Sequence, residues 1–500
     1  MSVSYIGSIS SSMLQSIVDM RAKLDDLQRQ LGSGQKSTTY AGLGVNRGVS
    51  VSLRSQLSAL SSYGNTIDIV GTRLNVAQSA LTAMDGIAHD VKISAIQSDF
   101  SIDQTGQTNE QKVAYNSLDE MLALLNSRAG DRYMFSGMSP DKPAVATTSA
   151  IINGDGARAG LKQIMAERLQ ADMGASGLGR LNVTSSGTTA MIAEDAVSPF
   201  GFKLASVNST LSNATVTGPG GGPPPTLDVD FTANPNAGEK ISVGLALPDG
   251  TTKLVTLTAT TASPAGTGEF TIGATPTDTA TSLKNALATS IGGLANTSLK
   301  TASALAAADN FFNIDGSHPP QRVDGPPFDT ATALIDGTDA NTVKWYTGED
   351  SSTPARSTAT AQVDSSVTVS YGLRANEQAL RLAVQNIAVF ATASFSPSDP
   401  NSAGNYSDLS SRVSAALDGS QGQQKITDIS AEIAGAQASF KSAQTRHQQT
   451  SNMLTDLLQS VEGVTPEEVG AQILSMQTSL QASLQTTAIL SKLSLVNFLQ

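Results

Sequence analysis

The chain of 500 residues contains no cysteine. Disulfide bonds, thiolate nucleophiles and cysteine-ligated metal sites are therefore excluded. An absence of cysteine fits a protein that is exported unfolded and then meets an uncontrolled redox environment, although many cytosolic proteins share this feature.

Aromatic residues are also scarce, at 4% of the chain, and there is a single tryptophan, Trp345. Leucine, isoleucine, valine and alanine must therefore build the core, which suits helical bundles better than a deep active site. No hydrophobic run reaches the length of a transmembrane helix. The first residues lack a basic segment followed by an apolar one, so we expect no cleaved signal peptide.

An excess of basic residues is missing as well, because the formal net charge is −12. Contacts to nucleic-acid phosphates and to anionic lipid both need clustered Lys and Arg. The composition therefore predicts no nucleic-acid partner and no membrane partner, and the acidic balance is accounted for by solubility.

Catalytic and cofactor motifs are missing from the sequence. It has no P-loop, no His-Glu-x-x-His and no Gly-x-Ser-x-Gly pattern. The three histidines, His89, His318 and His447, are far apart, and His447 falls on a heptad position where a packed or partner-facing histidine is expected. We therefore predict no catalytic residue, no cofactor and no metal site.

The chain does contain two heptad ladders, one near each end. Apolar residues that alternate at spacings of four and three form a narrow helical stripe that requires a partner helix. The N-terminal ladder is Met13, Ile17, Met20, Leu24, Leu27 and Leu31. The C-terminal ladder is Ile426, Ile429, Ile433, Ala436, Phe440, Ala443, His447, Thr450, Leu454, Leu457 and Val461. Stripes confined to the two ends indicate an assembling rod rather than a pocket.

Other helices follow from the same period. We expect one over Leu53–Val91, one over Asn109–Arg128 and one over Leu373–Phe390. The residues predicted to face inward in the second of these are Val113, Leu118, Leu122 and Leu125. Pro466 after Thr465 indicates a helix restart. The stripe of this last helix is Val469, Ile473, Met476, Leu480, Leu484 and Ala488. Its final stretch is apolar on most faces, which predicts burial against other subunits.

The middle of the chain is rich in Thr, Ser, Gly, Pro and Ala. Alternating segments at Thr226–Phe231 and Lys253–Thr258 predict strands, and Ala159–Met173 and Thr279–Thr289 predict helices. The fold class is therefore mainly α, with long N- and C-terminal helices that form a coiled-coil rod around an inserted β-rich outer domain. The predicted divisions are terminal coiled-coil segments 1–45 and 462–500, a helical rod domain of 46–182 and 370–461, and a variable outer domain of 183–369.

Three segments resemble the bacterial flagellin family. Leu27–Gly34 (LQRQLGSG) is similar to the family's helix and following turn, and Arg132–Gly137 (RYMFSG) is similar to the strand after its second helix. The ending Leu493–Leu499 (LSLVNFL) resembles that of the hook–filament junction protein, hook-associated protein 3. The resemblance covers about 1–140 and 370–500 and leaves out the middle.

The resemblance implies a structural, self-assembling subunit of the bacterial flagellum that supports motility and lies outside the cell. It implies type III export, other flagellin-family subunits and hook-associated proteins as partners, and an export chaperone at the C-terminal segment. The terminal helices then provide the assembly interface. The residues assigned to it are Met13, Ile17, Leu24, Leu27, Leu31, Ile473, Met476, Leu480, Leu484, Leu493, Val496 and Phe498.

Several alternatives stay open from the sequence. The chain fits a filament flagellin and a junction protein about equally well. It is also compatible with a secreted adhesin whose middle domain binds a ligand, whereas an enzyme in the middle domain is disfavoured by the shortage of His and paired carboxylates. The segment His89–Gln97 lacks the paired arginines of flagellins that host innate receptors sense.

Overall fold

A computed structural model of the chain describes residues 3–97, 100–220, 222–419 and 422–498, with the backbone alone described for 3–10, 97, 491 and 493–498. The chain folds into two units. Unit 1 contains residues up to Ile69, Gln362–Thr368 and the chain from Ala438 onward. Unit 2 contains Val70–Ala361 and Val369–Gln437.

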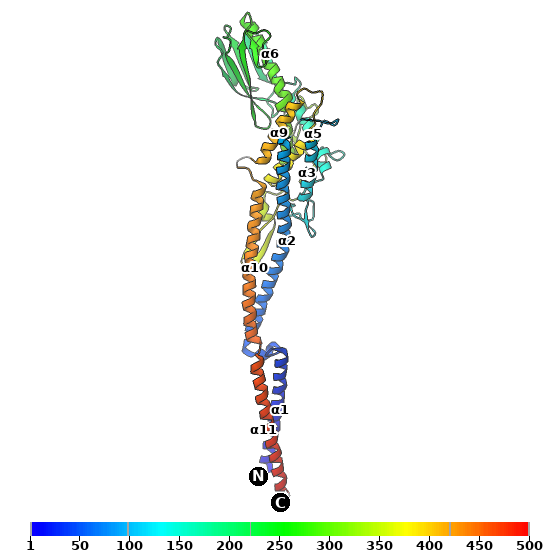
Figure 1. Cartoon of the computed structure of the whole chain (residues 1–500), viewed down its shortest axis with the longest axis vertical. Coiled ribbons are helices and arrows are strands. Elements are labelled where there is room, and N and C mark those ends of the chain that lie inside the picture. Colours follow the sequence, from blue (N-terminus) through cyan, green and yellow to red (C-terminus); the bar gives the residue numbers. More distant parts are fainter. Residues whose placement is uncertain (1–2, 98–99, 221, 420–421, 499–500) are drawn as a thin grey trace. The chain divides into compact units, whose positions relative to one another are not determined.

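Unit 1 is built from long helices. Its first helix, α1, spans Val3–Ser33, and its last helix, α11, spans Pro466–Phe498. The two pack side by side in opposite directions, so that the start of α1 and the end of α11 lie together (Figure 1). Gly34 ends α1 with φ +68, a left-handed conformation that favours glycine, and a short 3₁₀ helix, η1 (Tyr40–Asn46), follows.

Two further helices run from unit 1 into unit 2. They are α2 (Arg47–Gln97) and α10 (Ile426–Glu462). The predicted α10 ladder is confirmed from Ile426 to Leu454, since every position is buried except the half-buried Thr450. The prediction is wrong at Leu457, which is 47% exposed. Its neighbour Leu458 is half-buried instead, because a straight helix drifts out of phase with a strict heptad.

Unit 2 contains a cluster of shorter helices: α3 (Asn109–Leu125), α4 (Thr148–Asn153), α5 (Leu161–Met173), α6 (Pro276–Leu294), α7 (Lys300–Phe312), α8 (Gln378–Thr392) and α9 (Ser402–Asp418), with a π-helical turn η2 (Ala295–Leu299) before α7. In α3, Leu118, Leu122 and Leu125 are buried as predicted. Val113 is 54% exposed, so its inward assignment is wrong. The buried residues nearest to it are Gln111 and Ala114, which shows that a polar residue occupies the inner face there.

The helix predicted to begin at Leu373 begins five residues later because its first residues join another segment. The Ala375 N–H donates to the Phe135 carbonyl at 2.8 Å, and the Gly137 N–H donates to the Leu373 carbonyl at 3.1 Å. Phe135 is fully buried. The segment Arg132–Gly137 therefore ties the chain after α3 to the chain before α8, and only Arg132–Tyr133 of it is a regular strand.

The β-rich part of unit 2 has two four-stranded sheets. One has the strand order β3-β4-β7-β6 and is antiparallel throughout; the other has the order β10-β9-β8-β5, with β9 and β10 parallel. Their strands are β3 (Leu181–Ser186), β4 (Thr189–Glu194), β5 (Lys203–Ser209), β6 (Ala214–Gly220), β7 (Thr226–Phe231), β8 (Lys240–Ala246), β9 (Thr252–Thr260) and β10 (Glu269–Thr271).

Both sheets and α6 share one hydrophobic core, which includes Phe202, Phe231, Phe270 and Leu283. The strand predicted at Thr226–Phe231 is β7 with the same bounds, and its side chains alternate between buried and half-buried as its sequence indicates. Short two-stranded pairs complete the fold: β1 (Arg128–Ala129) with β2 (Arg132–Tyr133), β11 (Gln321–Val323) with β12 (Leu334–Asp336), and β13 (Thr360–Asp364) with β14 (Val367–Ser370). Among the described residues, none of the helices has the length and apolarity needed to span a bilayer.

Candidate assembly surface

The helix pair α1–α11 has a seam formed by the predicted ladders. On α1, Ile17 and Leu27 are 7% and 4% exposed, and the ladder residues between and around them, Met13, Met20 and Leu24, are half-buried. Leu31, at the end of the ladder, is 43% exposed. The seam is therefore a narrow coiled-coil contact rather than a closed core.

On α11 the first residues of the predicted stripe lie in the seam, but further along the helix the seam shifts to other positions. Val469 is buried, and Ile473, Met476 and Leu480 are half-buried. The contact continues through half-buried Ser483 and Thr487, which leaves Leu484 exposed beside the seam. The candidate assembly residues Leu493, Val496 and Phe498 lie outside the side chains that the structure describes.

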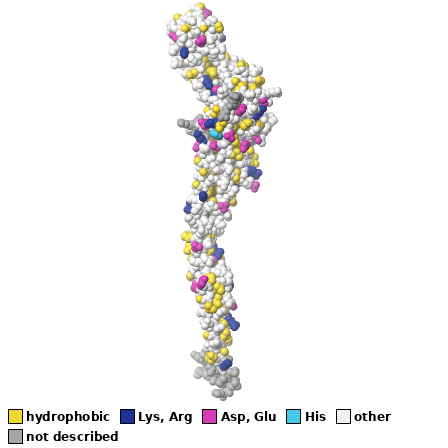
Figure 2. Space-filling view, in the orientation of Figure 1, with side chains coloured by type: hydrophobic (Ala, Val, Ile, Leu, Met, Phe, Trp, Pro, Cys, Tyr) yellow, Lys and Arg dark blue, Asp and Glu magenta, His cyan; other side chains and the backbone are white. Residues whose placement is uncertain are grey.

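A second set of apolar side chains points away from the seam. Leu14 and Val18 on α1 are 56% and 58% exposed, and Leu474 and Ile489 on α11 are 67% and 59% exposed. Figure 2 shows hydrophobic side chains on the surface of this helix pair among acidic and basic ones. The heptad ladder does not include these residues because it defines a single face of the helix, although the spacing of Leu14 and Val18 by one helical turn indicates a second apolar face.

The segment that follows α1 and the turn between α10 and α11 lie next to each other, and hydrogen bonds join them. The Lys36 N–H donates to the Glu462 carbonyl at 2.7 Å, and the Val464 N–H donates to the Gly34 carbonyl at 3.0 Å. The Lys36 ammonium also donates to the carbonyls of Ser460 and Val461, both at 3.0 Å. A cation at these last carbonyls of α10 stabilises the helix end. Residues 34–36 and 460–464 thus form one hydrogen-bonded contact within unit 1, which we call the joint.

Glu462 provides the side-chain part of this joint. It is 9% exposed and accepts hydrogen bonds from the Ser50 hydroxyl and from Arg54 Nε at 2.9 Å, with Arg54 Nη2 on its second oxygen at 2.5 Å. The Arg54 guanidinium, and to a lesser extent the Ser50 hydroxyl, hold the pKa of the Glu462 carboxyl below its usual value. A bidentate arginine pair of this kind fixes geometry as well as charge.

We expect Glu462→Gln to weaken the joint by about 1–2 kcal/mol at pH 7, because the half-exposed Arg54 makes the pair weaker than a buried one. A lowered folded-state pKa gives stability above the unfolded pKa of about 4.3, and that stability is lost as pH falls through the folded value. The difference between wild type and variant should therefore shrink below about pH 4. Hydrogen exchange of the Lys36 and Val464 amides measures this difference in the stability of the joint.

The control for this prediction is Asp456→Asn, which removes one carboxylate charge from an exposed position of the same helix. It should leave the exchange of both amides unchanged. Equal effects of the two variants would show that net charge, and not the Arg54 contact, acts on the joint.

His447 is packed in unit 1, which confirms one of the two expectations for it. It is 7% exposed, its ring centroid lies 5.8 Å from that of Tyr63, and its Nε2 lies 3.6 Å from Asp364 Oδ2. Within the described part of the chain, no group of three His, Asp or Glu side chains is placed to hold a metal ion.

A comparison with protein families identifies the N-terminal part of the chain. Residues 7–139 match the sequence model of the bacterial flagellin N-terminal helical region. The matched residues include nearly all of α1, all of α2 and α3, and the segment Arg132–Gly137. A search of curated proteins gives no match.

Proposed function

We propose that the chain, whose residues 7–139 match the bacterial flagellin N-terminal helical region, is a member of the bacterial flagellin family and acts in motility as a subunit of the filament or of the hook–filament junction. Members of this family are structural proteins that assemble with other flagellin subunits on the outside of the cell. We also propose hook-associated proteins, an export chaperone at the C-terminal segment and the type III export route for this chain.

The observation that supports the proposal is the apolar surface of the α1–α11 pair. Each of Leu14, Val18 and Leu474 is more than half exposed. Burying one such side chain against a neighbour stabilises a contact by about 1.5–3 kcal/mol. A polymer repeats this gain in every subunit, so a helix pair with apolar residues on both sides of its seam is suited to assembly.

The test is to place a charge on this surface at a position where the isolated subunit does not bury the side chain. Val18→Asp should leave the subunit folded, because Val18 is 58% exposed. In the polymer the carboxylate would be buried without a partner, and a cost of about 3 kcal/mol would raise the critical concentration for polymerisation about 100-fold. Sedimentation of polymer from purified subunits measures this concentration.

Gln28→Asp is the matched control, since it adds the same charge to an exposed polar position of α1. It should raise the critical concentration much less. If Val18→Asp polymerises as readily as Gln28→Asp, the outward face of α1 is not a subunit contact.

The position along the flagellum needs a separate experiment. Immunogold labelling of intact flagella should stain the whole filament if the chain is a filament subunit, and only a point near the base if it is a junction protein. We propose that residues 1–45 and 462–500 form the inner layer, 46–182 and 370–461 the rod, and 183–369 the outer domain in either case.

A further inference from the structure

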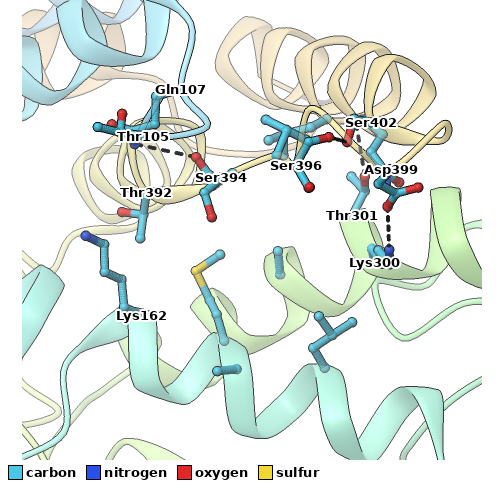
Figure 3. A pocket seen from close by; sticks show the side chains of 18 residues that line it. Thr105, Gln107, Lys162, Lys300, Thr301, Thr392, Ser394, Ser396, Asp399 and Ser402 are labelled. Carbon is cyan, nitrogen blue, oxygen red and sulfur yellow. Dashed lines mark hydrogen bonds and ion pairs between the residues drawn. The ribbon is translucent and has the colours of Figure 1, made fainter. Parts of the chain in front are cut away.

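Unit 2 contains a cavity of about 610 Å³ that the assembly function does not use. Its walls come from four parts of the chain: the segment before α3, helix α5, helix α7, and the segment from the end of α8 into α9 (Figure 3). The volume lies within the range of about 300–1,000 Å³ that is typical of small-molecule sites.

The two long walls of the cavity differ in chemistry. Met165, Ala166 and Leu169 of α5, with Ala304 of α7, form an apolar wall. The opposite wall carries hydroxyls and amides from Thr105, Gln107, Ser394, Ser396 and Ser402. A ligand that fits both walls has an aliphatic face and several hydroxyl groups.

A lysine stands at each end of the cavity, and the two differ in their partners. Figure 3 shows Lys162 at one end and Lys300 at the other. Lys300 Nζ lies 3.2 Å from Asp399 Oδ2, so this end is electrically neutral. Within the described part of the chain Lys162 forms no ion pair. The cavity therefore has one uncompensated positive charge, which favours a single negative charge on the ligand.

Two buried polar groups in the same wall lack hydrogen bonds. Thr392 and Asn405 are each 6% exposed, and Thr392 Oγ1 and Asn405 Oδ1 find no partner within the described residues. Buried polar atoms are nearly always hydrogen-bonded, and leaving one unpaired is unfavourable. Both residues belong to the lining of the cavity, so this part of the wall carries polar groups below its surface as well as on it.

We propose that this cavity binds a small organic monocarboxylate that carries several hydroxyl groups and is about the size of a monosaccharide. The Lys162 ammonium binds the carboxylate, the hydroxyl wall exchanges hydrogen bonds with the ligand hydroxyls, and the α5 wall contacts its C–H face. The site lies in unit 2 and is independent of the assembly surface of unit 1, so either proposal can fail without the other.

The experiment is ligand-observed NMR on the full-length monomer with D-galacturonate as the probe. D-Galactose, which has the hydroxyls without the charge, and acetate, which has the charge without the hydroxyls, are the matched ligands. We expect saturable binding of galacturonate with a Kd of about 1 mM, as the size of the ligand allows. The two matched ligands should bind at least about 10-fold more weakly, because each lacks one set of contacts.

Two variants locate the site. Lys162→Gln should weaken galacturonate binding about 10-fold or more and remove the preference over galactose. Ala166→Phe should fill the cavity and abolish binding without changing the thermal unfolding temperature, since residue 166 is at the surface. The control Lys284→Gln removes a half-buried lysine from α6, away from the cavity lining, and should bind like wild type.

The remaining outcomes each overturn the proposal. Absence of saturable binding rules out the site. Equal binding of galacturonate and acetate shows an unspecific charge effect, and unchanged binding by Lys162→Gln or Ala166→Phe shows that the ligand lies elsewhere.

Discussion

Leu480→Asp is expected to abolish incorporation of the subunit into the polymer while unit 2 keeps its thermal unfolding temperature. Leu480 is half-buried in the seam of α11 with α1. In the monomer an aspartate there can remain partly hydrated, so the cost is limited to a loosened helix pair. In the polymer, neighbouring subunits would exclude water from it, and burying an unpaired charge costs several kcal/mol in every subunit.

The control is Gln481→Asp, one residue along the same helix at an exposed polar position. It carries the same charge and should assemble with a critical concentration close to that of wild type. Electron microscopy of polymers and calorimetry of monomers give the two readouts. Equal assembly of both variants would show that assembly does not depend on the α1–α11 seam at Leu480. A lowered unfolding temperature of unit 2 would mean that α11 stabilises more than its own helix pair.

The long helices could be predicted because their information is local. In α2, Leu53, Leu74 and Val91 all lie on the predicted stripe and are all buried. The alternation in Thr226–Phe231 gave the bounds of β7 for the same reason, since the side-chain direction in a strand repeats every two residues. Both patterns are fixed by backbone geometry that each segment contains within itself.

The errors come from contacts between distant segments. Residues 373–375 have a helical pattern, yet they pair with Phe135 and Gly137, more than 200 residues earlier in the chain. Nothing local identifies this pairing. The joint of unit 1 is similar: the turn at the end of Leu27–Gly34, implied by the resemblance, and the restart at Pro466 were both expected, but not their hydrogen bonds to each other.

The candidate assembly surface was predicted in part. The ladders identified the α1–α11 seam, but a strict heptad continued it to Leu484, where the structure passes through Ser483 and Thr487. The outward residues Leu14, Val18 and Leu474 were not assigned, because a heptad pattern defines only one face of a helix and these residues lie off it. The subunit contacts themselves stay a prediction.

Arg168→Met is expected to destabilise unit 2 by about 3–5 kcal/mol, because it removes the cation from a buried ion pair. Arg168 Nε lies 2.9 Å from Asp172 Oδ2, and their side chains are 5% and 0% exposed. Asp172 also accepts the Gly201 N–H at 2.8 Å, and the Arg168 guanidinium lies 4.9 Å from the centre of the Phe200 ring. The pair thus holds α5 against the chain that precedes β5.

The pH dependence of this effect has a definite sign. Burial raises the pKa of the Asp172 carboxyl even with Arg168 beside it. Removing the cation raises it further, so the folded variant takes up a proton at Asp172 more readily than the unfolded chain does. A raised folded-state pKa gives stability that is present below the unfolded pKa of about 3.9 and is lost as pH rises through the folded value. The difference between wild type and variant should therefore be smaller at about pH 4 than at pH 7.

Two further variants make the prediction specific. Arg158→Met removes the cation of an exposed Arg–Asp pair with Asp155, whose side chains are 42% and 40% exposed, and should cost at most about 1 kcal/mol. Arg168→Met combined with Asp172→Leu should recover much of the lost stability, because no charge is then left buried. Denaturant unfolding of the four proteins at both pH values provides the comparison. If Arg168→Met costs no more than Arg158→Met, or if the double variant is no better than Arg168→Met alone, the buried pair does not hold α5 in place through its charge.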